Sequence, residues 1–346
     1  MVLIEGDNGT GKSSILEALY YGCYLRSFRT SASREIVSFL DDAKSSTFFV
    51  KIELAQSDPL AVGNTLYIGY SRDKKVVKID QKTIISHTQL LDHYRVISVC
   101  EDDLFLIKGS PQYRRLFIDQ MISLTNQDFS VLLRDYKTTL SQRNALIAKK
   151  LIDVTLYDLW TQQLWEKTRQ IQKMRIAVLE ILESSVNTLI EEYLDEDVSV
   201  SFSYVAARKS DTLDLETFKA KNTLLQQDES RFFRSLFGVH LDDIAITFRQ
   251  RNSRAYASRG QQKLTMLLIK IAQIQHFSAK HGDVIFLLDD FLVDFDENNI
   301  KKIFLILSNL TSQCIITAPA KETVLKKLLL EQRIEYTVVV LDNPVV

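Results

Sequence analysis

Apolar residues recur every three or four positions through the middle of the chain, whereas they alternate with polar residues in segments on either side. The helical stripe consists of Trp160, Leu164, Ile171, Met174, Val178, Leu182, Val186, Leu189 and Tyr193. Between Pro111 and Gly238 the sequence contains neither proline nor glycine, the residues that most often interrupt helices. We therefore predict long helices here, with the stripe packed in a core rather than against a partner helix.

Segments with the pattern of β-strands lie before and after this helical region. Three of them precede it, at residues 46–54, 65–71 and 75–80. Their β-branched and aromatic residues predict a small antiparallel sheet. Residues 198–205 alternate cleanly and are predicted to form one further strand.

The last part of the chain alternates between apolar runs and helical segments. The runs lie at residues 284–288, 314–316 and 337–341, and the helical segments lie near 297–310 and 321–332. Such alternation is typical of a parallel α/β sheet. The sequence therefore predicts an α/β core that is interrupted by a helical lobe.

A glycine-rich segment near the N-terminus follows a short apolar run and precedes a helical pattern. "GDNGTGKS", residues 6–13, matches the P-loop pattern G-x-x-x-x-G-K-[ST] in the order of strand, loop and helix that this motif requires. Its backbone N–H groups would hold phosphates, Lys12 would reach the β- and γ-phosphates, and the Ser13 hydroxyl would bind Mg²⁺. The predicted nucleotide-binding residues are Gly6, Asp7, Asn8, Gly9, Thr10, Gly11, Lys12, Ser13 and Ser14. ATP and Mg²⁺ are the expected cofactors, and the alternative is a glycine-rich turn with a solvated lysine.

Two aspartates follow the apolar run at 284–288. A strand this apolar is buried, so Asp289 and Asp290 would face the crevice in which open α/β sheets bind ligands. Asp289 is the predicted Mg²⁺ ligand. Asp290, together with Lys12, is predicted to be catalytic, because a carboxylate here could orient or deprotonate an attacking water. The alternative is a pair of acidic residues in a solvated loop.

The net charge and the cysteine content limit which binding partners the protein can have and in which cellular compartment it can act. The chain has 43 basic and 44 acidic residues, so its overall charge does not attract nucleic acid. Cys23, Cys100 and Cys314 form no C-x-x-C pair, which argues against a disulfide framework or a zinc site. No signal peptide and no apolar run of membrane-spanning length is found, so we expect a cytoplasmic protein without a membrane partner.

One stretch is locally basic, because no acidic residue occurs between Asp243 and Asp283. It contains Arg249, Arg251, Arg254, Arg259, Lys263, Lys270 and Lys280. This charge could complement a nucleotide triphosphate, contact DNA phosphates or be solvated, and the sequence leaves the three interpretations open. The DNA candidates in it are Arg249, Arg251 and Arg254. Weaker candidates elsewhere are Arg114, Arg115 and the pair Arg26 and Arg29.

The segment "YASRGQQKLTMLLIKIAQ", residues 256–273, has an unusual first turn for a helix. Ser258, Gly260 and Gln261 bring two small residues and an amide to its start. Small residues let a phosphate approach the backbone, and a helix N-terminus favours negative charge. The alternative is a surface helix with Ser258 as its N-cap.

A P-loop, a long helical insertion, "SRGQQ" and "LLDD" in this order resemble the head of an ABC-type ATPase, and more narrowly the RecF family of bacterial recombination mediators. The blocks that carry the resemblance are "LRSFRT" (25–30), "EDDLFLIKGSPQYRRLFID" (101–119), "SQRNALI" (141–147), "GVHLDD" (238–243), "ASRGQQKL" (257–264) and "LLDDFLVDFD" (287–296). The resemblance implies an α/β fold, an ABC-type ATPase head with a P-loop core and a small antiparallel sheet, interrupted by a helical lobe. The expected parts are the first part of the head (1–108), the helical lobe (109–197) and the second part of the head (198–346).

The resemblance also implies a role and partners. A member of this family is expected to be a weak, DNA-stimulated ATPase of recombinational repair that forms a homodimer on binding ATP. It would bind double-stranded or gapped DNA and work with RecR and RecO in loading RecA. In such a dimer, Ser258, Gly260 and Gln261 would bind the γ-phosphate held by the other protomer, and Asp296 of the D-loop would lie close to the interface.

Two other functions are considered beside this one. A transporter ATPase subunit is disfavoured by the long helical lobe and by Ala318, which follows Thr317 where transporter ATPases carry a histidine. A nucleotide-binding module without hydrolysis is disfavoured by the intact Lys12 and the two aspartates.

The chain departs from the family pattern at a few positions. Glu101 and Val239 replace family prolines, Leu241 replaces an arginine, and Arg259 stands within the signature. Family heads also begin with two strands ahead of the P-loop, whereas this sequence starts five residues before Gly6. We expect these differences to affect local geometry and adenine contacts, not the class of protein.

Overall fold

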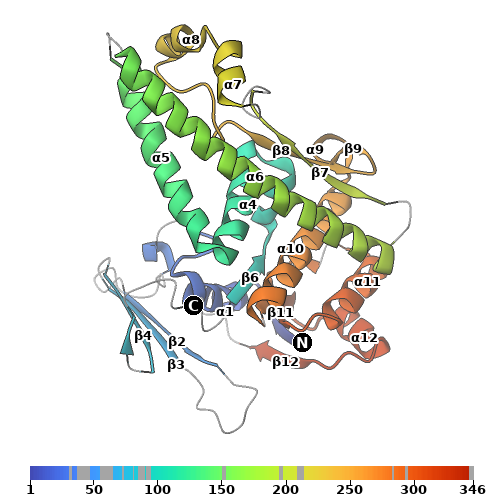
Figure 1. Ribbon diagram of the computed structural model, residues 1–346. Helices are drawn as coiled ribbons and strands as arrows, with labels where there is room; N and C mark the ends of the chain where they lie inside the picture. Colours follow the sequence, from blue (N-terminus) through green and yellow to red (C-terminus); the bar gives the residue numbers. More distant parts are fainter. Residues whose placement is uncertain are drawn as a thin grey trace. The chain divides into compact units, whose positions relative to one another are not determined.

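A computed structural model of the chain describes residues 1–30, 33–36, 47–54, 65–71, 74–80, 82–84, 90, 95–149, 153–194, 198–208, 214–282, 284–292 and 295–342. The chain divides into two units, one formed by residues 1–102 with 274–346 and the other by residues 103–273 (Figure 1). Among the helices in these ranges, none is both long and apolar enough to cross a membrane.

The first unit is built on a five-stranded parallel sheet in the order β12-β1-β11-β10-β6. Its strands are β1 (Val2–Gly6), β6 (Arg95–Val99), β10 (Val284–Leu288), β11 (Gln313–Pro319) and β12 (Thr337–Leu341). The parallel α/β sheet predicted from the three C-terminal apolar runs is therefore confirmed. β6 is not among the predicted strands, although its β-branched residues carry the usual signal.

Helices of the first unit connect these strands. They are α1 (Lys12–Tyr24), α11 (Glu297–Ser308), α12 (Val324–Glu331) and the short 3₁₀ helix η1 (Ser33–Ile36). α11 begins where it is predicted to begin and ends two residues earlier, and α12 is three residues shorter at its start and one residue shorter at its end. Their apolar faces are buried, as expected for helices that join strands of a parallel sheet.

The predicted small antiparallel sheet is also confirmed, as part of the first unit. Its strands are β2 (Thr47–Glu53), β3 (Thr65–Ser71), β4 (Lys74–Ile79) and β5 (Lys82–Thr83). Ser46, included in the prediction, lies outside the described residues. One face of this sheet packs on α1, where the Tyr21 ring meets Phe48 edge-on with 5.1 Å between ring centroids.

The second unit is mainly helical. Its helices are α3 (Phe105–Lys108), α4 (Pro111–Thr125), α5 (Gln127–Ile147), α6 (Val154–Tyr193), α7 (Leu215–Lys221), α8 (Leu225–Phe232), α9 (Ser253–Tyr256) and α10 (Arg259–His281), preceded by the 3₁₀ helix η2 (Glu101–Leu104). α10 continues past residue 273 into the first unit. α5 and the 40-residue α6 run side by side (Figure 1). Leu164, Ile171 and Leu182 of the predicted stripe are fully buried, which confirms its packing in a core.

A third sheet completes the second unit. It consists of β7 (Val200–Val205), β8 (Asp243–Phe248) and β9 (Arg251–Asn252) in antiparallel order. β7 is the predicted strand at 198–205. β8 and β9 are not predicted, and they fall inside the stretch that the sequence marks only as basic.

Candidate nucleotide-binding and catalytic site

The loop that follows β1 turns sharply through left-handed glycines. Gly9 has φ 87° and Gly11 has φ 93°, conformations that residues with a Cβ adopt only with strain. Thr10 closes the turn by donating from its backbone N–H and its hydroxyl to the Asp7 carbonyl, at 3.3 and 3.0 Å. A Cβ at Gly6 would collide with the Thr10 hydroxyl, so the loop is too tight for a side chain there.

Lys12 opens α1 and points into this loop. Its Nζ donates to the Gly6 carbonyl at 2.7 Å and to the Asp7 carbonyl at 3.1 Å, and the side chain is buried. The two carbonyls satisfy two of the three N–H donors of this side chain. The loop thus has the N-terminal end of a helix and a positive charge at the same place, which is the arrangement that binds phosphate.

Ser13 and Asp289 come together although 276 residues separate them in sequence. The Ser13 hydroxyl donates to Asp289 Oδ1 at 2.8 Å. β1 and β10 flank β11 in the sheet, so the start of α1 and the end of β10 meet at the carboxyl edge. A hydroxyl and a carboxylate oxygen side by side are ligands of the kind that hard divalent cations prefer. The residues present therefore fit Mg²⁺.

Thr317, near the end of β11, links the two aspartates. Its hydroxyl accepts the Asp290 N–H at 2.7 Å and lies 3.2 Å from both Asp289 Oδ1 and Asp290 Oδ1. Asp290 has φ 46°, a left-handed conformation that costs a non-glycine residue about 1 kcal/mol or more. The contact with the Thr317 hydroxyl fixes the backbone in this conformation and aims the carboxylate. Thr317 is itself 1% exposed.

Thr317 is a site residue that the sequence does not single out. It stands inside an apolar run, and a threonine there fits an ordinary strand. The only signal is its position beside Ala318, where the transporter ATPases carry a histidine. Its contacts with the aspartates follow from the neighbouring positions of β10 and β11.

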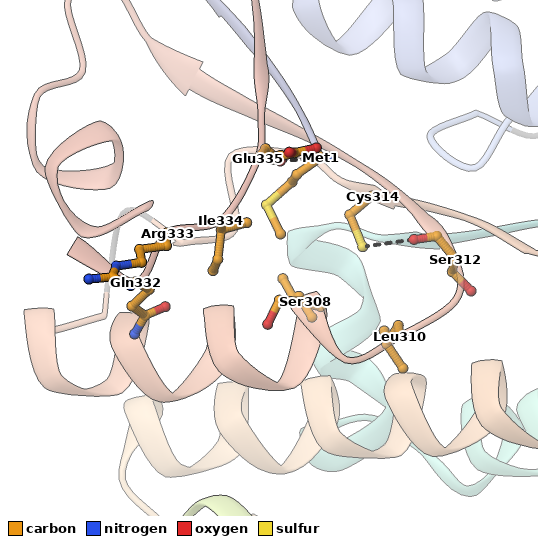
Figure 2. A pocket seen from close by; sticks show the side chains of 10 residues that line it. Met1, Ser308, Leu310, Ser312, Cys314, Gln332, Arg333, Ile334 and Glu335 are labelled. Atoms are coloured by element: carbon orange, nitrogen blue, oxygen red, sulfur yellow. Dashed lines mark hydrogen bonds between the residues drawn. The ribbon is translucent and has the colours of Figure 1, made fainter. Parts of the chain in front are cut away.

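One cavity lies at the opposite, amino edge of the parallel sheet. It has a volume of about 360 Å³ and is lined by residues that include Met1, Ser308, Ser312, Cys314 and Gln332 (Figure 2). Met1 stands at the start of β1 and Cys314 near the start of β11. The cavity is therefore separated from the P-loop by the length of the strands and does not contribute to the predicted site.

Ser258, Gly260 and Gln261 lie in the second unit, at the start of α10. The Gln261 N–H donates to the Ser258 hydroxyl at 3.3 Å, and the Ser258 N–H donates to Gln261 Oε1 at 2.9 Å. This is a capping box, so the N-cap geometry considered as an alternative is present. Capping and phosphate binding are compatible, because the cap leaves the N-terminus of α10 exposed.

Gly260 is not required by the packing of the described residues. None of their atoms lies within 4 Å of the position that a Cβ at Gly260 would occupy. Glycine in a helix costs about 1 kcal/mol relative to alanine, so its presence in the first turn needs another reason. Close approach of an external group to the backbone is one such reason.

The basic residues between Asp243 and Asp283 include both exposed and buried side chains. Arg249, Arg251 and Arg254 are exposed at and just after the β8–β9 hairpin. Lys270 is buried and pairs with Asp103 at 2.6 Å, so the interpretation as solvated charge is wrong for it. The prediction that Arg114 contacts DNA is wrong for the same reason. Its side chain is buried and donates to both carboxylate oxygens of Asp243.

Asp296 caps α11. Its carboxylate accepts the Asn299 N–H at 3.0 Å, and this hydrogen bond is the main reason why the pKa of Asp296 is lowered. The side chain is exposed, so it is accessible to a second protein chain. The predicted D-loop is the segment "VDFD", residues 293–296. Phe295 of this segment is buried, and Val293 and Asp294 lie outside the described residues.

Comparison with known proteins identifies the family. The family model for the RecF/RecN/SMC N terminal domain matches residues 1–337. The DNA replication and repair protein RecF of Enterococcus faecalis (strain ATCC 700802 / V583) is 32% identical over 305 residues, which cover 85% of this chain and 80% of that protein. The protein of the same name from Ligilactobacillus salivarius (strain UCC118) is 29% identical and covers 96% of this chain and 88% of its own length. The chain belongs to the RecF family.

Solved structures agree with this assignment. The recombination mediator protein RecF in the RecF-ATP structure of the RecFOR pathway is 26% identical, with a TM-score of 0.77 over 93% of this chain and 86% of that one. The Smc head domain from Pyrococcus furiosus is 16% identical with a TM-score of 0.51 over 94% of this chain and 85% of that one, and it shares the fold alone. The chain is therefore an ABC/SMC-type ATPase head of a DNA repair and recombination family, and a transporter subunit is not favoured.

Proposed function

We propose that this chain is an ATP-dependent DNA-binding protein that acts in recombinational repair and in the processing of replication forks and gaps. In this proposal ATP closes a homodimer on double-stranded or gapped DNA, and the closed dimer assists the loading of RecA together with RecR and RecO. The observation that carries the proposal is the meeting of the P-loop, Ser13, Asp289 and Asp290 at one edge of the sheet.

The P-loop would bind the triphosphate through its backbone N–H groups. Lys12 would exchange its contacts with the Gly6 and Asp7 carbonyls for phosphate oxygens, which carry more negative charge. Ser13 and Asp289 would hold Mg²⁺, which when bound would neutralise phosphate charge. Among the described residues no group of three or more His, Cys, Asp or Glu side chains could hold a metal, so this pair would depend on nucleotide and water oxygens for the remaining ligands.

Asp290 would accept a proton from the attacking water or orient that water. The Thr317 hydroxyl has one proton, so it can donate to only one of the two aspartates at a time. With Thr317 donating to Asp289, Asp290 Oδ1 would be left as an acceptor. Thr317 would thus be a positioning residue for the catalytic carboxylate.

The signature residues would act on a nucleotide bound to a second copy of the chain. Gly260 would let the γ-phosphate approach the backbone, and the N-terminus of α10 would stabilise its charge. Asp296, exposed at the start of α11, would lie near the same interface. The division into head segments 1–108 and 198–346 around a lobe at 109–197 belongs to this proposal.

DNA would be contacted by the arginines of the β8–β9 hairpin. Arg249 and Gln250 form its two-residue turn and both have positive φ, 49° and 60°, which is the geometry of a type I′ turn. Arg249, Arg251 and Arg254 are exposed, so their charge is available to phosphates. The proposal places DNA on this hairpin and assigns weak, DNA-stimulated turnover to the head.

ATP turnover measured with and without duplex DNA tests this proposal. We expect slow turnover of the full chain that rises when duplex DNA is added, and loss of both rates in Lys12→Ala. Turnover that does not respond to DNA would contradict the repair function. Nucleotide binding with no turnover would instead indicate a binding module.

A further inference from the structure

Two neighbouring phenylalanines are exposed at the end of α8. Phe232 is 61% exposed and Phe233 is 65% exposed, and they stand between the exposed Arg231 and Arg234. α7 and α8 lie at the end of the α5–α6 pair where α5 ends and α6 begins (Figure 1). Residues 231–234, named the RFFR segment after their sequence, belong to none of the blocks that carry the resemblance to the RecF family. That resemblance therefore assigns them no role.

The backbone of Phe233 has a conformation that its side chain disfavours. Phe233 follows the last residue of α8 and has φ 54°, in the left-handed region. This position of a helix usually holds glycine or asparagine, because a bulky side chain there strains the backbone. Burial of the ring would be one reason to keep a phenylalanine here, but the ring is exposed. The packing of the described residues therefore does not explain Phe233, and strained residues of this kind are often found at functional sites.

Arg143 of α5 holds the chain on both sides of the RFFR segment. Its guanidinium donates to the two carboxylate oxygens of Glu229, at 2.8 and 2.6 Å, and to the Ser235 hydroxyl at 2.8 Å. The Ser235 N–H also donates to Asn144 Oδ1 at 2.8 Å. Arg143, Glu229 and Ser235 are fully buried. The RFFR segment is thus exposed but anchored at both ends, and a surface that is already ordered loses little conformational entropy on binding.

Arg231 and Arg234 are available to an external carboxylate. Within the part of the chain that the structure describes, neither guanidinium forms an ion pair or a hydrogen bond. The planar guanidinium group of arginine forms paired hydrogen bonds with a carboxylate. Arginine and aromatic residues are also enriched in protein–protein interfaces. The composition of the RFFR segment is therefore that of a protein-binding surface.

The charge around the RFFR segment disfavours a polyanion. Residues 214–234, which contain α7 and α8, have four acidic and four basic residues. Glu229 is neutralised by Arg143, which leaves a small positive balance with both signs interspersed. A polynucleotide binds best to a continuous positive surface, because it carries a charge at every phosphate. A protein segment instead supplies separate carboxylates, which can match two arginines and avoid the neighbouring acidic residues.

We propose that the RFFR segment binds a segment of another protein in which apolar side chains lie between carboxylates. The apolar side chains pack on Phe232 and Phe233, and the carboxylates pair with Arg231 and Arg234. Buried aromatic side chains supply most of the binding energy at such a contact, whereas the ion pairs set its orientation. The site contains no residue of the P-loop, of the two aspartates or of the β8–β9 hairpin. It thus goes beyond the proposed ATP-dependent binding of DNA.

Selection from a displayed library of random dodecapeptides, with the full-length chain as the target, tests this site. The comparison is with the variant Phe232→Gln with Phe233→Asn, which removes both rings. Asparagine tolerates the left-handed conformation, so this variant should melt at the wild-type temperature or higher. Peptides that bind the wild type and not the variant should be enriched in aspartate and glutamate on either side of aromatic or aliphatic residues.

Fluorescence anisotropy with the most enriched peptide then measures the two contributions separately. We expect the affinity to fall roughly tenfold or more in the ring variant, and by a similar factor in Arg231→Gln with Arg234→Gln. Leu330→Asn removes an equally exposed apolar side chain from α12 and is the matched control, expected to bind like the wild type. Binding should persist in Lys12→Ala, so the result is independent of the proposed ATP function.

Three outcomes overturn the proposal. The first is a selection in which no peptide distinguishes the wild type from the ring variant, or in which the distinguishing peptides lack acidic residues. The second is a lower melting temperature of the ring variant, which would show that Phe232 and Phe233 hold the fold. The third is a loss of duplex or oligothymidylate binding in the double arginine variant with unchanged peptide affinity, which would assign the two arginines to nucleic acid.

Discussion

The Thr317 hydroxyl lies between the two carboxylates that follow β10, within 3.2 Å of each. Asp289 also accepts the Ser13 hydroxyl, whereas Asp290 is held through its backbone N–H in a left-handed conformation. The two adjacent aspartates thus have different surroundings, and this difference is the basis for proposing cation binding by Asp289 and proton transfer to Asp290.

Replacing Asp290 with asparagine keeps the shape of the side chain but removes its ability to accept a proton. We expect Asp290→Asn to bind ATP with normal affinity and to hydrolyse it roughly 10²- to 10⁴-fold more slowly, so that the closed dimer accumulates. Single-turnover hydrolysis and nucleotide titration measure the two effects. Asp135→Asn, the same change at an exposed position of α5, is the control. Normal turnover in Asp290→Asn would remove this residue from the catalytic step.

Thr317→Val keeps nearly the same volume but removes the hydroxyl between the aspartates. A hydrogen bond to a charged group contributes about 1.5–3 kcal/mol, so we expect turnover to fall roughly tenfold or more while ATP affinity changes little. Thr317→Ser restores the hydroxyl and should recover most of the rate. If the valine and serine variants are equally slow, the effect comes from packing of β11 and not from the hydroxyl.

At the scale of secondary structure, the β8–β9 hairpin places arginines of the basic stretch at an exposed turn. A two-residue type I′ turn usually contains asparagine or glycine, because both central residues need positive φ. Here Arg249 and Gln250 occupy these positions. The positive φ angles of Arg249 and Gln250 therefore strain the backbone, and this strain lies where three arginines are exposed. Strained backbone of this kind is often found at functional sites.

Reversing Arg249, Arg251 and Arg254 to glutamate should weaken duplex binding and reduce its salt dependence. The slope of log K against log salt is negative, and each lost phosphate contact reduces its magnitude by about 0.9. Three lost contacts therefore reduce the magnitude by roughly 2 to 3. Duplex titrations at several salt concentrations give the slope. The control is the reversal of Lys137, Lys149 and Lys173, which changes the net charge equally on α5, the residues after it and α6. An unchanged slope in the arginine variant would mean that DNA does not contact the hairpin.

His240 links the turn before β8 to α5, because its Nδ1 lies 2.7 Å from the Tyr136 hydroxyl. Burial, with a smaller contribution from the charge of the nearby Arg115, lowers the pKa of His240 to about 4. The unfolded chain therefore binds more protons than the folded one between about pH 6.5 and pH 4. Stability contributed by neutral His240 is complete above about pH 6.5 and is lost as the pH falls toward 4, by up to about 3 kcal/mol.

Urea unfolding at pH 7 and pH 5 checks this effect against His240→Gln, which keeps a polar side chain without the titration. The wild type should lose more stability than the variant between the two values. Equal losses would show that carboxylates elsewhere account for the acid sensitivity.

The sequence predicts the elements whose pattern is local and misses those that depend on a partner. The strand at 198–205 and the long α6 are predicted by clear periodicity, and Lys12, Ser13 and Asp289 by the P-loop and the apolar strand before the aspartates. β8 has the same alternation, with Ile244, Ile246 and Phe248 buried, but the arginines that follow it dominate that stretch. Thr317 could not be predicted, because its role depends on the distance between two neighbouring strands.

At the scale of the whole molecule, the chain distributes its predicted nucleotide contacts over two units. The P-loop and the aspartates belong to the first unit, and Ser258, Gly260 and Gln261 belong to the second. The capping box explains how the start of α10 is stabilised but not why a glycine stands in it. In the proposed dimer, that glycine would face a nucleotide held by the other copy.

Mixing two inactive variants tests whether the start of α10 acts on a nucleotide bound to the partner protomer. Lys12→Ala disables a protomer's own P-loop, and Ser258→Arg blocks the approach of the γ-phosphate from the partner, so neither variant alone should dimerise on ATP. A mixed dimer contains one doubly defective site and one intact site, which pairs the P-loop of the Ser258→Arg chain with the signature helix of the Lys12→Ala chain. We predict partial recovery of ATP-induced dimerisation on mixing, measured by sedimentation. Wild-type dimerisation by Ser258→Arg alone would show that this segment is only a helix cap, and would contradict the account.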